Sequence, residues 1–194
     1  MGTVFISYRR DDDPFAVEQL EAFLAQALGP DEVFRDTSDI THGSAWRQVI
    51  DDAIQRHAVL LVVIGRDWDA PRLHDTDDNV RYEIERGLQS GKLVVPVLVG
   101  RAAWPTADQL PSSIASLAAL DYAPLRTGAD LTRDEQHILE TLLAVCPVIL
   151  RGDVKGRFVL GTVELRVDGH DGDRCGHLLG NRTARLVPWR PGDT

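Results

Sequence analysis

Two long runs of apolar residues constrain this chain more than any other feature. The runs AVLLVVIG at 58–65 and LVVPVLVG at 93–100 contain no charged side chain and no alternation of polar with apolar residues. A strand with one face in water alternates in this way, whereas a strand buried on both faces is apolar throughout. Both runs are therefore predicted to be inner strands of a parallel sheet with helices on either side.

The rest of the first 147 residues alternates between strand patterns and helix patterns. Runs of β-branched and aromatic residues predict further strands at 3–8, 32–36 and 118–122. Apolar residues at helical spacing predict helices at 11–28, 44–56, 77–88 and 132–146, with a weak helix or turn at 107–117. Regular alternation of strands and helices predicts an α/β fold, a doubly wound five-stranded parallel sheet with right-handed crossovers.

The composition changes after Pro147, which predicts a boundary between a domain at 1–147 and an extension at 148–194. Residues 151–194 hold eight of the 21 Lys and Arg but only six of the 30 Asp and Glu. Strand-like runs at 156–169 and 176–189 predict a short β-rich hairpin in this extension. A lone hairpin is marginally stable in water, so we expect it to pack on the main domain or on a partner.

Charge and composition exclude several classes of protein. The net charge is −9 and the isoelectric point is about 5.0, which disfavours binding to nucleic acid or to anionic membranes. The longest apolar run is too short to span a bilayer, and the N-terminus lacks the pattern of a signal peptide. Two distant cysteines, Cys146 and Cys175, suggest a reducing compartment. We therefore expect a soluble cytoplasmic protein.

The candidate site lies beyond the carboxyl ends of the strands, where open parallel sheets bind their ligands. The segments at these positions are 7–13, 35–43, 65–79 and 100–104. Neither the dinucleotide-binding pattern G-x-G-x-x-G after the first strand nor the phosphate-binding pattern G-x-x-x-x-G-K-[ST] is present. The nucleophile pattern G-x-S-x-G is also missing, and LDYAPLR at 120–126 lacks the lysine that a phosphoacceptor domain requires.

Three motifs in order carry a resemblance to a known family. They are VFISYRRDD at 4–12, VFRDTSDITHGSAWRQVIDDAI at 33–54, and WD followed by DDNVRYEIERGLQSGKLVVPVLV at 77–99. Together they resemble a TIR (Toll/interleukin-1 receptor) domain of the bacterial, NAD+-cleaving kind over residues 1–147. The resemblance implies a flavodoxin-like sheet. Many members of the family cleave NAD+ at the nicotinamide–ribose bond, and others act as adaptors through TIR–TIR contacts.

The same resemblance assigns a catalytic role to Glu83. The family's catalytic glutamate lies on the helix after the third strand in a pattern like D-W-V-x-x-E-[IL], which corresponds here to residues 78–84. Helical periodicity alone does not separate Glu83 from Glu85, because the two lie on opposite flanks of the same apolar stripe. The position directly before Ile84 makes Glu83 the matched acid and leaves Glu85 as a solvated residue.

The resemblance also implies a set of substrate-binding residues. One group lines the nucleotide pocket, and another belongs to the loop at 36–43 that gates the pocket and mediates assembly. Asn79 replaces the tryptophan that the family often has at that position. The full set is Ser7, Tyr8, Arg9, Arg10, Asp36, Ile40, Gly43, Trp46 and Asn79.

Several of these residues have a purely structural alternative. Arg9 and Arg10 could pair with the acids at 11–13 as surface charges, or with a pyrophosphate. Trp46 is open to interpretation as a core anchor or as a platform for a ligand, as is Trp68. The acidic residues before the helix at 77–88 are expected to be solvated and to favour the helix dipole. No spacing of His and Cys matches a zinc site, so no metal is expected.

Cleavage of NAD+ suits a site with a single carboxylate. Nicotinamide departs as a neutral molecule and needs no acid, while the ribose develops positive charge that a carboxylate stabilises. The two-carboxylate arrangement of ordinary glycosidases is not required. We therefore expect an NAD+ glycohydrolase without a cofactor that yields nicotinamide and ADP-ribose or a cyclic ADP-ribose. It would act as a defence or signalling effector, activated by self-association and triggered by a separately encoded sensor.

Two other functions remain open at this point. The first is a non-catalytic TIR adaptor that works through TIR–TIR contacts. The second is a nucleotide-signal receptor whose extension at 148–194 binds a small molecule.

Overall fold

The computed structural model describes residues 3–35, 44–68, 70–145, 157–160, 163–166 and 187–188. The chain divides into two compact units, Met1–Cys146 and Pro147–Thr194. Within the described ranges, no helix is long and apolar enough to cross a membrane.

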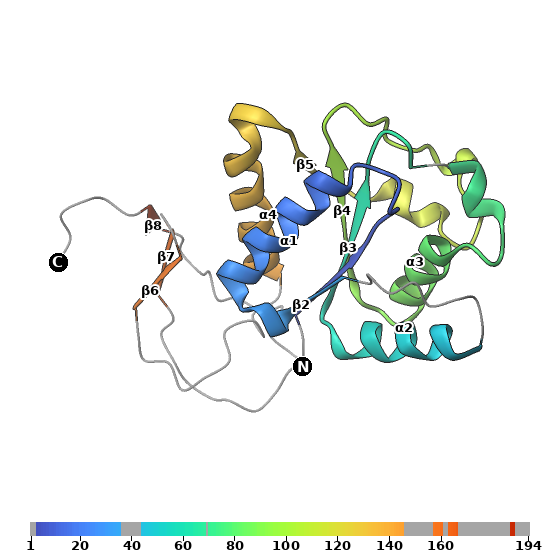
Figure 1. Cartoon of the computed structure of the whole chain (residues 1–194), viewed down its shortest axis with the longest axis horizontal. Helices are drawn as coiled ribbons and strands as arrows, with labels where there is room; N and C mark the ends of the chain where they lie inside the picture. Colours follow the sequence, from blue (N-terminus) through green and yellow to red (C-terminus); the bar gives the residue numbers. More distant parts are fainter. Residues whose placement is uncertain are drawn as a thin grey trace. The chain divides into compact units, whose positions relative to one another are not determined.

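The first unit is built on five parallel strands in the order β2-β1-β3-β4-β5 (Figure 1). Strand β1 pairs with β2 on one side and with β3 on the other, so that Val4 aligns with both Val33 and Val59. The strands are β1 (Val4–Ser7), β2 (Val33–Arg35), β3 (Val59–Ile64), β4 (Leu93–Val99) and β5 (Ala123–Leu125). This is the flavodoxin-like order, and it confirms the predicted doubly wound sheet.

Four helices cover the two faces of this sheet. Helices α1 (Pro14–Leu28) and α4 (Leu131–Val145) lie on one face, and α2 (Ser44–Arg56) and α3 (Asn79–Gln89) lie on the other (Figure 1). The bounds of α2 match the predicted helix at 44–56. Helix α3 begins two residues later than predicted, because Asp78 has an extended backbone and accepts a hydrogen bond from the Arg81 N–H as the N-cap.

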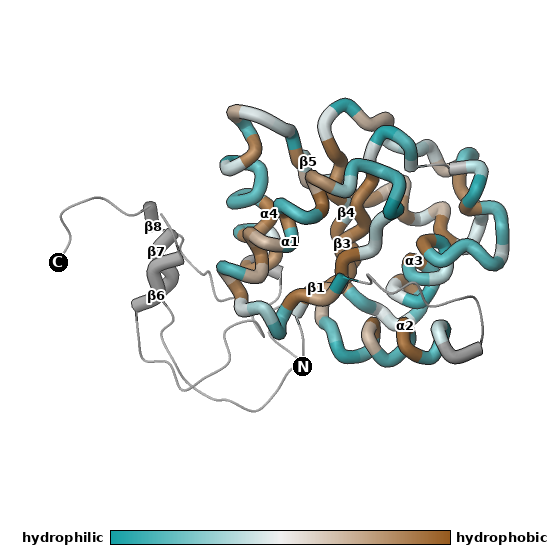
Figure 2. Tube along the Cα trace, in the orientation of Figure 1, coloured by the Kyte–Doolittle hydropathy of each residue, from teal (hydrophilic) through white to brown (hydrophobic). Residues whose placement is uncertain are grey.

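The two apolar runs form β3 and β4 at the centre of the core. Every residue of β3 is buried, as is every residue of β4 after Leu93. Figure 2 shows these two strands as hydrophobic segments between the helices of the first unit. Helix α3 approaches this layer closely at Gly87, where a Cβ atom would overlap the side chain of Leu60. The absence of a side chain at Gly87 therefore lets α3 lie directly against β3.

The predicted position of the fifth strand is wrong. The segment predicted at 118–122 overlaps the end of a 3-10 helix, η4 (Ala115–Ala119), and the strand follows it at Ala123–Leu125. Strand β5 pairs only with β4, at the edge of the sheet, and Pro124 lies at its centre. An edge strand tolerates proline because one side of its ladder is unpaired, so the usual signals for a strand are weak here. The weak helix predicted at 107–117 is replaced by η3 (Ala107–Gln109) and η4.

The second unit contains a small antiparallel sheet in the order β6-β7-β8. Its strands are β6 (Arg157–Leu160), β7 (Val163–Arg166) and β8 (Val187–Pro188). The run predicted as one strand at 156–169 thus contains two strands that pair with each other, with Leu160 opposite Val163. Gly161 interrupts this run in the sequence, and a glycine within a strand pattern signals such a break.

Candidate functional site

A cleft of about 460 Å³ lies at the carboxyl end of β1, next to the start of α3. Parallel sheets of this order bind ligands where the strand order reverses, which is between β1 and β3. The lining comes from the end of β1 and its following loop, from η2 (Ala70–His74) and its following turn, and from α3. These residues are Ile6, Tyr8, Arg9, Arg10, Asp11, Arg72, Asp75, Asp77, Asp78, Asn79, Val80 and Glu83.

The Glu83 carboxylate lines this cleft and is held by a serine from the neighbouring strand. The Ser7 hydroxyl donates a hydrogen bond of 2.5 Å to Glu83 Oε2. Both residues are buried, with Ser7 1% and Glu83 5% exposed. Ser7 is the last residue of β1, so the sheet itself positions this contact across 76 residues of sequence. This hydrogen bond from the end of β1 fixes the orientation of the Glu83 carboxylate.

Glu85 has a different environment from Glu83. It forms an ion pair of 2.7 Å with Arg81 one turn earlier and accepts a hydrogen bond from the Ser113 hydroxyl. Burial acts to raise the pKa of Glu85, but the hydrogen bonds from Ser113 and Arg81 and the charge of Arg81 outweigh it and lower the pKa. Glu85 is therefore an ionised structural residue outside the cleft, and its partners distinguish it from Glu83.

Arg9 and Asp78 form a buried ion pair at the start of α3. Arg9 donates from Nη1 to Asp78 Oδ2 at 2.8 Å and from Nη2 to Asp78 Oδ1 at 3.2 Å. Their side chains are only 5% and 4% exposed. Two expectations from the sequence are thus wrong: Arg9 is a buried residue and not a surface charge, and Asp78 is not solvated. The pair ties the loop after β1 to the helix that carries Glu83.

Asp12 is a second buried acid that the sequence did not single out. Its carboxylate accepts hydrogen bonds from the backbone N–H groups of Gly65 at 2.9 Å and Asp67 at 2.8 Å. Burial raises the pKa of Asp12, and these two backbone hydrogen bonds act in the opposite direction. A Cβ atom at Gly65 would overlap the Asp12 carboxylate. Asp12 therefore joins the loops after β1 and β3, although nothing in the run DDD distinguishes it from its neighbours.

Trp46, a residue of α2, packs in the core and does not line the cleft. It is 6% exposed and packs edge-on against Tyr82 of α3, with 5.1 Å between ring centroids. The Tyr82 hydroxyl donates to Asp51 of α2, as does the Arg86 guanidinium. These contacts hold α2 against α3. Trp68 is likewise buried in the core.

The remaining predicted residues have mixed positions. Tyr8 and Arg10 line the cleft, and the Arg35 guanidinium lies 5.4 Å from the centre of the Tyr8 ring. Asn79 also lines the cleft, and its buried Oδ1 has no hydrogen-bond partner among the described residues. Asp36, Ile40 and Gly43 lie outside the described residues. Arg72, which the sequence did not suggest, contributes a further guanidinium to the lining.

The cleft thus contains two buried carboxylates, Glu83 held by Ser7 and Asp78 paired with Arg9, together with more exposed charged groups. Within the part of the chain that the structure describes, no group of three or more His, Cys, Asp or Glu could hold a metal ion. A carboxylate in such a position can stabilise positive charge that develops on a bound ligand.

The fold is a flavodoxin-like α/β domain with a cleft where the strand order reverses. The chain belongs to the TIR domain family, whose model matches residues 4–143. No curated protein sequence matches the chain significantly.

Solved structures share this fold at low sequence identity. One set is the TIR domains of the activated Roq1 resistosome, which directly recognises the pathogen effector XopQ. Their sequence identity to this chain is 17% and the TM-score is 0.54, and the alignment covers 73% of this chain and 99% of theirs. The TIR domain of the Toll-related receptor TRR-2 from Hydra magnipapillata is 19% identical with a TM-score of 0.51, covering 74% of this chain and 99% of its own.

Proposed function

We propose that this TIR domain is an NAD+ glycohydrolase in which Glu83 is the catalytic carboxylate. The observation that carries the proposal is the Glu83 side chain in the lining of the cleft, oriented by the 2.5 Å hydrogen bond from Ser7. The nicotinamide ring of NAD+ is cationic, so it becomes neutral when it leaves with the electron pair of the broken bond. The protein therefore needs no acid to protonate the leaving group. Its task is to stabilise the positive charge that develops on the ribose.

The reaction needs only groups that the cleft supplies. The bond between the ribose C1′ and the nicotinamide nitrogen breaks, and its electron pair leaves with nicotinamide. Glu83 stabilises the cationic ribose, and water attacks C1′ and loses a proton to the solvent to give ADP-ribose. An attack by the adenine ring, also followed by loss of a proton, would give a cyclic product. No cofactor is required in this scheme. Tyr8, Arg10 and Asn79 line the same cleft and would surround the reacting ribose.

Self-association is part of the proposal. One structural relative, the set of Roq1 TIR domains, belongs to an activated resistosome. We infer that the present domain likewise becomes active when copies associate through surfaces that include residues 36–43. In the cell it would act in the cytoplasm as a signalling or defence effector, triggered by a separately encoded sensor.

A non-catalytic adaptor is the second candidate, and one observation favours it. Glu83 is only 5% exposed in the single chain, so a purely structural role for the Ser7–Glu83 contact would also explain the geometry. In that case the domain would work through TIR–TIR contacts alone.

NAD+ turnover distinguishes the two candidates. The purified full-length chain is incubated with NAD+ over a wide range of protein concentrations, and the products are separated by chromatography. We expect nicotinamide release that increases more steeply than protein concentration, and a loss of about 10²- to 10³-fold in Glu83→Gln. Glu85→Gln is the matched control, because Glu85 lies on the same helix outside the cleft. Association without turnover at any concentration would favour the adaptor.

A further inference from the structure

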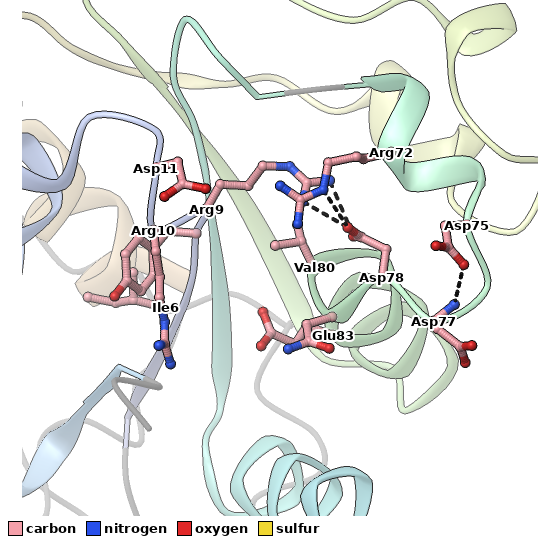
Figure 3. A pocket seen from close by; sticks show the side chains of 12 residues that line it. Ile6, Arg9, Arg10, Asp11, Arg72, Asp75, Asp77, Asp78, Val80 and Glu83 are labelled. Carbon is pink, nitrogen blue, oxygen red and sulfur yellow. Dashed lines mark hydrogen bonds and ion pairs between the residues drawn. The ribbon is translucent and has the colours of Figure 1, made fainter. Parts of the chain in front are cut away.

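Asp78 has two arginines as neighbours rather than one. Arg9 binds it through two hydrogen bonds, and Arg72 Nε lies 3.8 Å from Asp78 Oδ2. Figure 3 shows the side chains of Arg9, from the loop after β1, and of Arg72, from η2, converging on this single carboxylate. Asp78 is therefore shared between a buried guanidinium and an exposed one.

The two arginines differ in what they offer to a ligand. Arg9 is 5% exposed, and its guanidinium is occupied in binding Asp78 through both terminal nitrogens. Arg72 is 59% exposed, and its 3.8 Å contact is longer than a hydrogen bond. In the described part of the chain this ion pair is the one recorded interaction of the Arg72 side chain. The donors of Arg72 are therefore accessible from the cleft.

The backbone beneath Arg72 is firmly held. Leu73, the next residue of η2, is fully buried in the core. The following carbonyl, of His74, accepts a hydrogen bond of 3.1 Å from Arg81 of α3. An arginine on a fixed backbone beside a cleft loses less freedom when it binds an anion than one on an unsupported loop.

We propose that Arg72 is the direct contact for the diphosphate of the bound dinucleotide, with the Arg9–Asp78 pair as its support. Guanidinium groups bind phosphate oxygens through paired, charge-assisted hydrogen bonds. This inference rests on the proposed function. It assigns the diphosphate contact to Arg72, which the sequence did not indicate, and not to Arg9, whose guanidinium binds Asp78.

The spacing of the charges suits NAD+. Five of the residues that line the cleft are carboxylates and three are arginines, so the cleft as a whole is acidic. Asp78, which both arginines approach, is separated from Glu83 by about 7.5 Å along α3, from a rise of about 1.5 Å per residue. In NAD+ the nicotinamide ribose is joined to the diphosphate through its O5′, so the cationic ribose and the anionic diphosphate are neighbours. The cationic nicotinamide ribose would then lie at Glu83 while the diphosphate lies at Arg72.

Binding of ADP and adenosine to the full-length chain tests this assignment. The two probes differ in the diphosphate, so calorimetry isolates its contribution. In Arg72→Gln we expect ADP binding to weaken about ten- to hundredfold, as a charged hydrogen bond is lost, with adenosine binding unchanged. Arg72→Lys should recover part of the loss, because lysine keeps the charge but not the paired donors. Arg101→Gln is the matched control, since Arg101 is exposed and lies outside the lining.

The outcomes separate this inference from the proposed function. If Arg72→Gln binds ADP like the wild type while Glu83-dependent cleavage of NAD+ is observed, the role of Arg72 is refuted and the function stands. If NAD+ is not cleaved but ADP binding depends on Arg72, the subsite stands and the glycohydrolase assignment fails. A wild-type chain that binds neither ADP nor NAD+ overturns both.

Discussion

Replacing Asp78 by asparagine should strongly destabilise the first unit. Asparagine keeps the N-cap of α3, because its side-chain oxygen can still accept from the Arg81 N–H. It removes the charge that balances Arg9, whose side chain is 5% exposed. Breaking a buried ion pair by removing one partner costs about 3–5 kcal/mol, because the other charge stays buried. Since an amide oxygen still accepts one hydrogen bond from Arg9, we expect the lower end, about 3 kcal/mol.

Related substitutions divide this cost into its parts. Asp78→Ala loses the N-cap as well, which adds about 1 kcal/mol. The double variant Arg9→Met/Asp78→Leu removes both charges, and apolar replacement of a buried pair is often neutral, so it should be more stable than either single variant. Asp77→Asn is the matched control: its carboxylate pairs with Arg47, but the two side chains are 75% and 45% exposed. Exposed pairs contribute about 0–1 kcal/mol.

Urea unfolding followed by tryptophan fluorescence measures these effects, because Trp46 and Trp68 are both buried in the first unit. For a unit of this size, about 3 kcal/mol corresponds to a decrease in Tm of very roughly 10 °C. A cost below about 1 kcal/mol for Asp78→Asn, equal to that of Asp77→Asn, would refute the argument, since it would place the Arg9–Asp78 pair in a solvent-like environment.

Two further predictions concern buried groups elsewhere in the first unit. Gly65→Ala should destabilise it by about 1–3 kcal/mol in the same unfolding assay, because the added methyl group displaces the Asp12 carboxylate from its backbone donors; unchanged stability would show that the Asp12 contact contributes nothing. Burial lowers the pKa of His57 from its ordinary value of 6.5. Below about pH 6.5 the unfolded chain therefore takes up a proton that the folded chain does not, so the free energy of unfolding should fall as the pH decreases. His57→Phe should flatten this dependence while the exposed His137→Gln retains it, and a wild-type stability that stays constant from pH 7 to pH 5 would contradict the role of His57.

The fold was largely predictable because its strongest signals are local. The apolar runs that form β3 and β4 could only be inner strands, and the spacing around Trp46 set the bounds of α2. The position of β5 was not predictable in this way, because a short edge strand centred on Pro124 carries neither alternation nor a long apolar run.

The site was predictable only in part, for a related reason. The motif that contains Glu83 indicated which acid to examine, but periodicity placed Glu83 and Glu85 on equivalent flanks of α3. Their difference comes from partners far away in sequence, Ser7 for Glu83 and Ser113 for Glu85. The Arg9–Asp78 pair likewise joins residues 69 positions apart. Such contacts follow from the strand order of the sheet, and no local pattern in the sequence encodes them.

The initial rate of nicotinamide release from NAD+ tests the catalytic role of Glu83 most directly. It should be measured on concentrated full-length wild type, Glu83→Gln and Glu85→Gln, after their unfolding curves have shown that all three are folded. If Glu83 is the catalytic carboxylate, Glu85→Gln should retain the wild-type rate within a few-fold and Glu83→Gln should be slower by about 10²- to 10³-fold. A Glu83→Gln variant that releases nicotinamide as fast as the wild type would contradict this role.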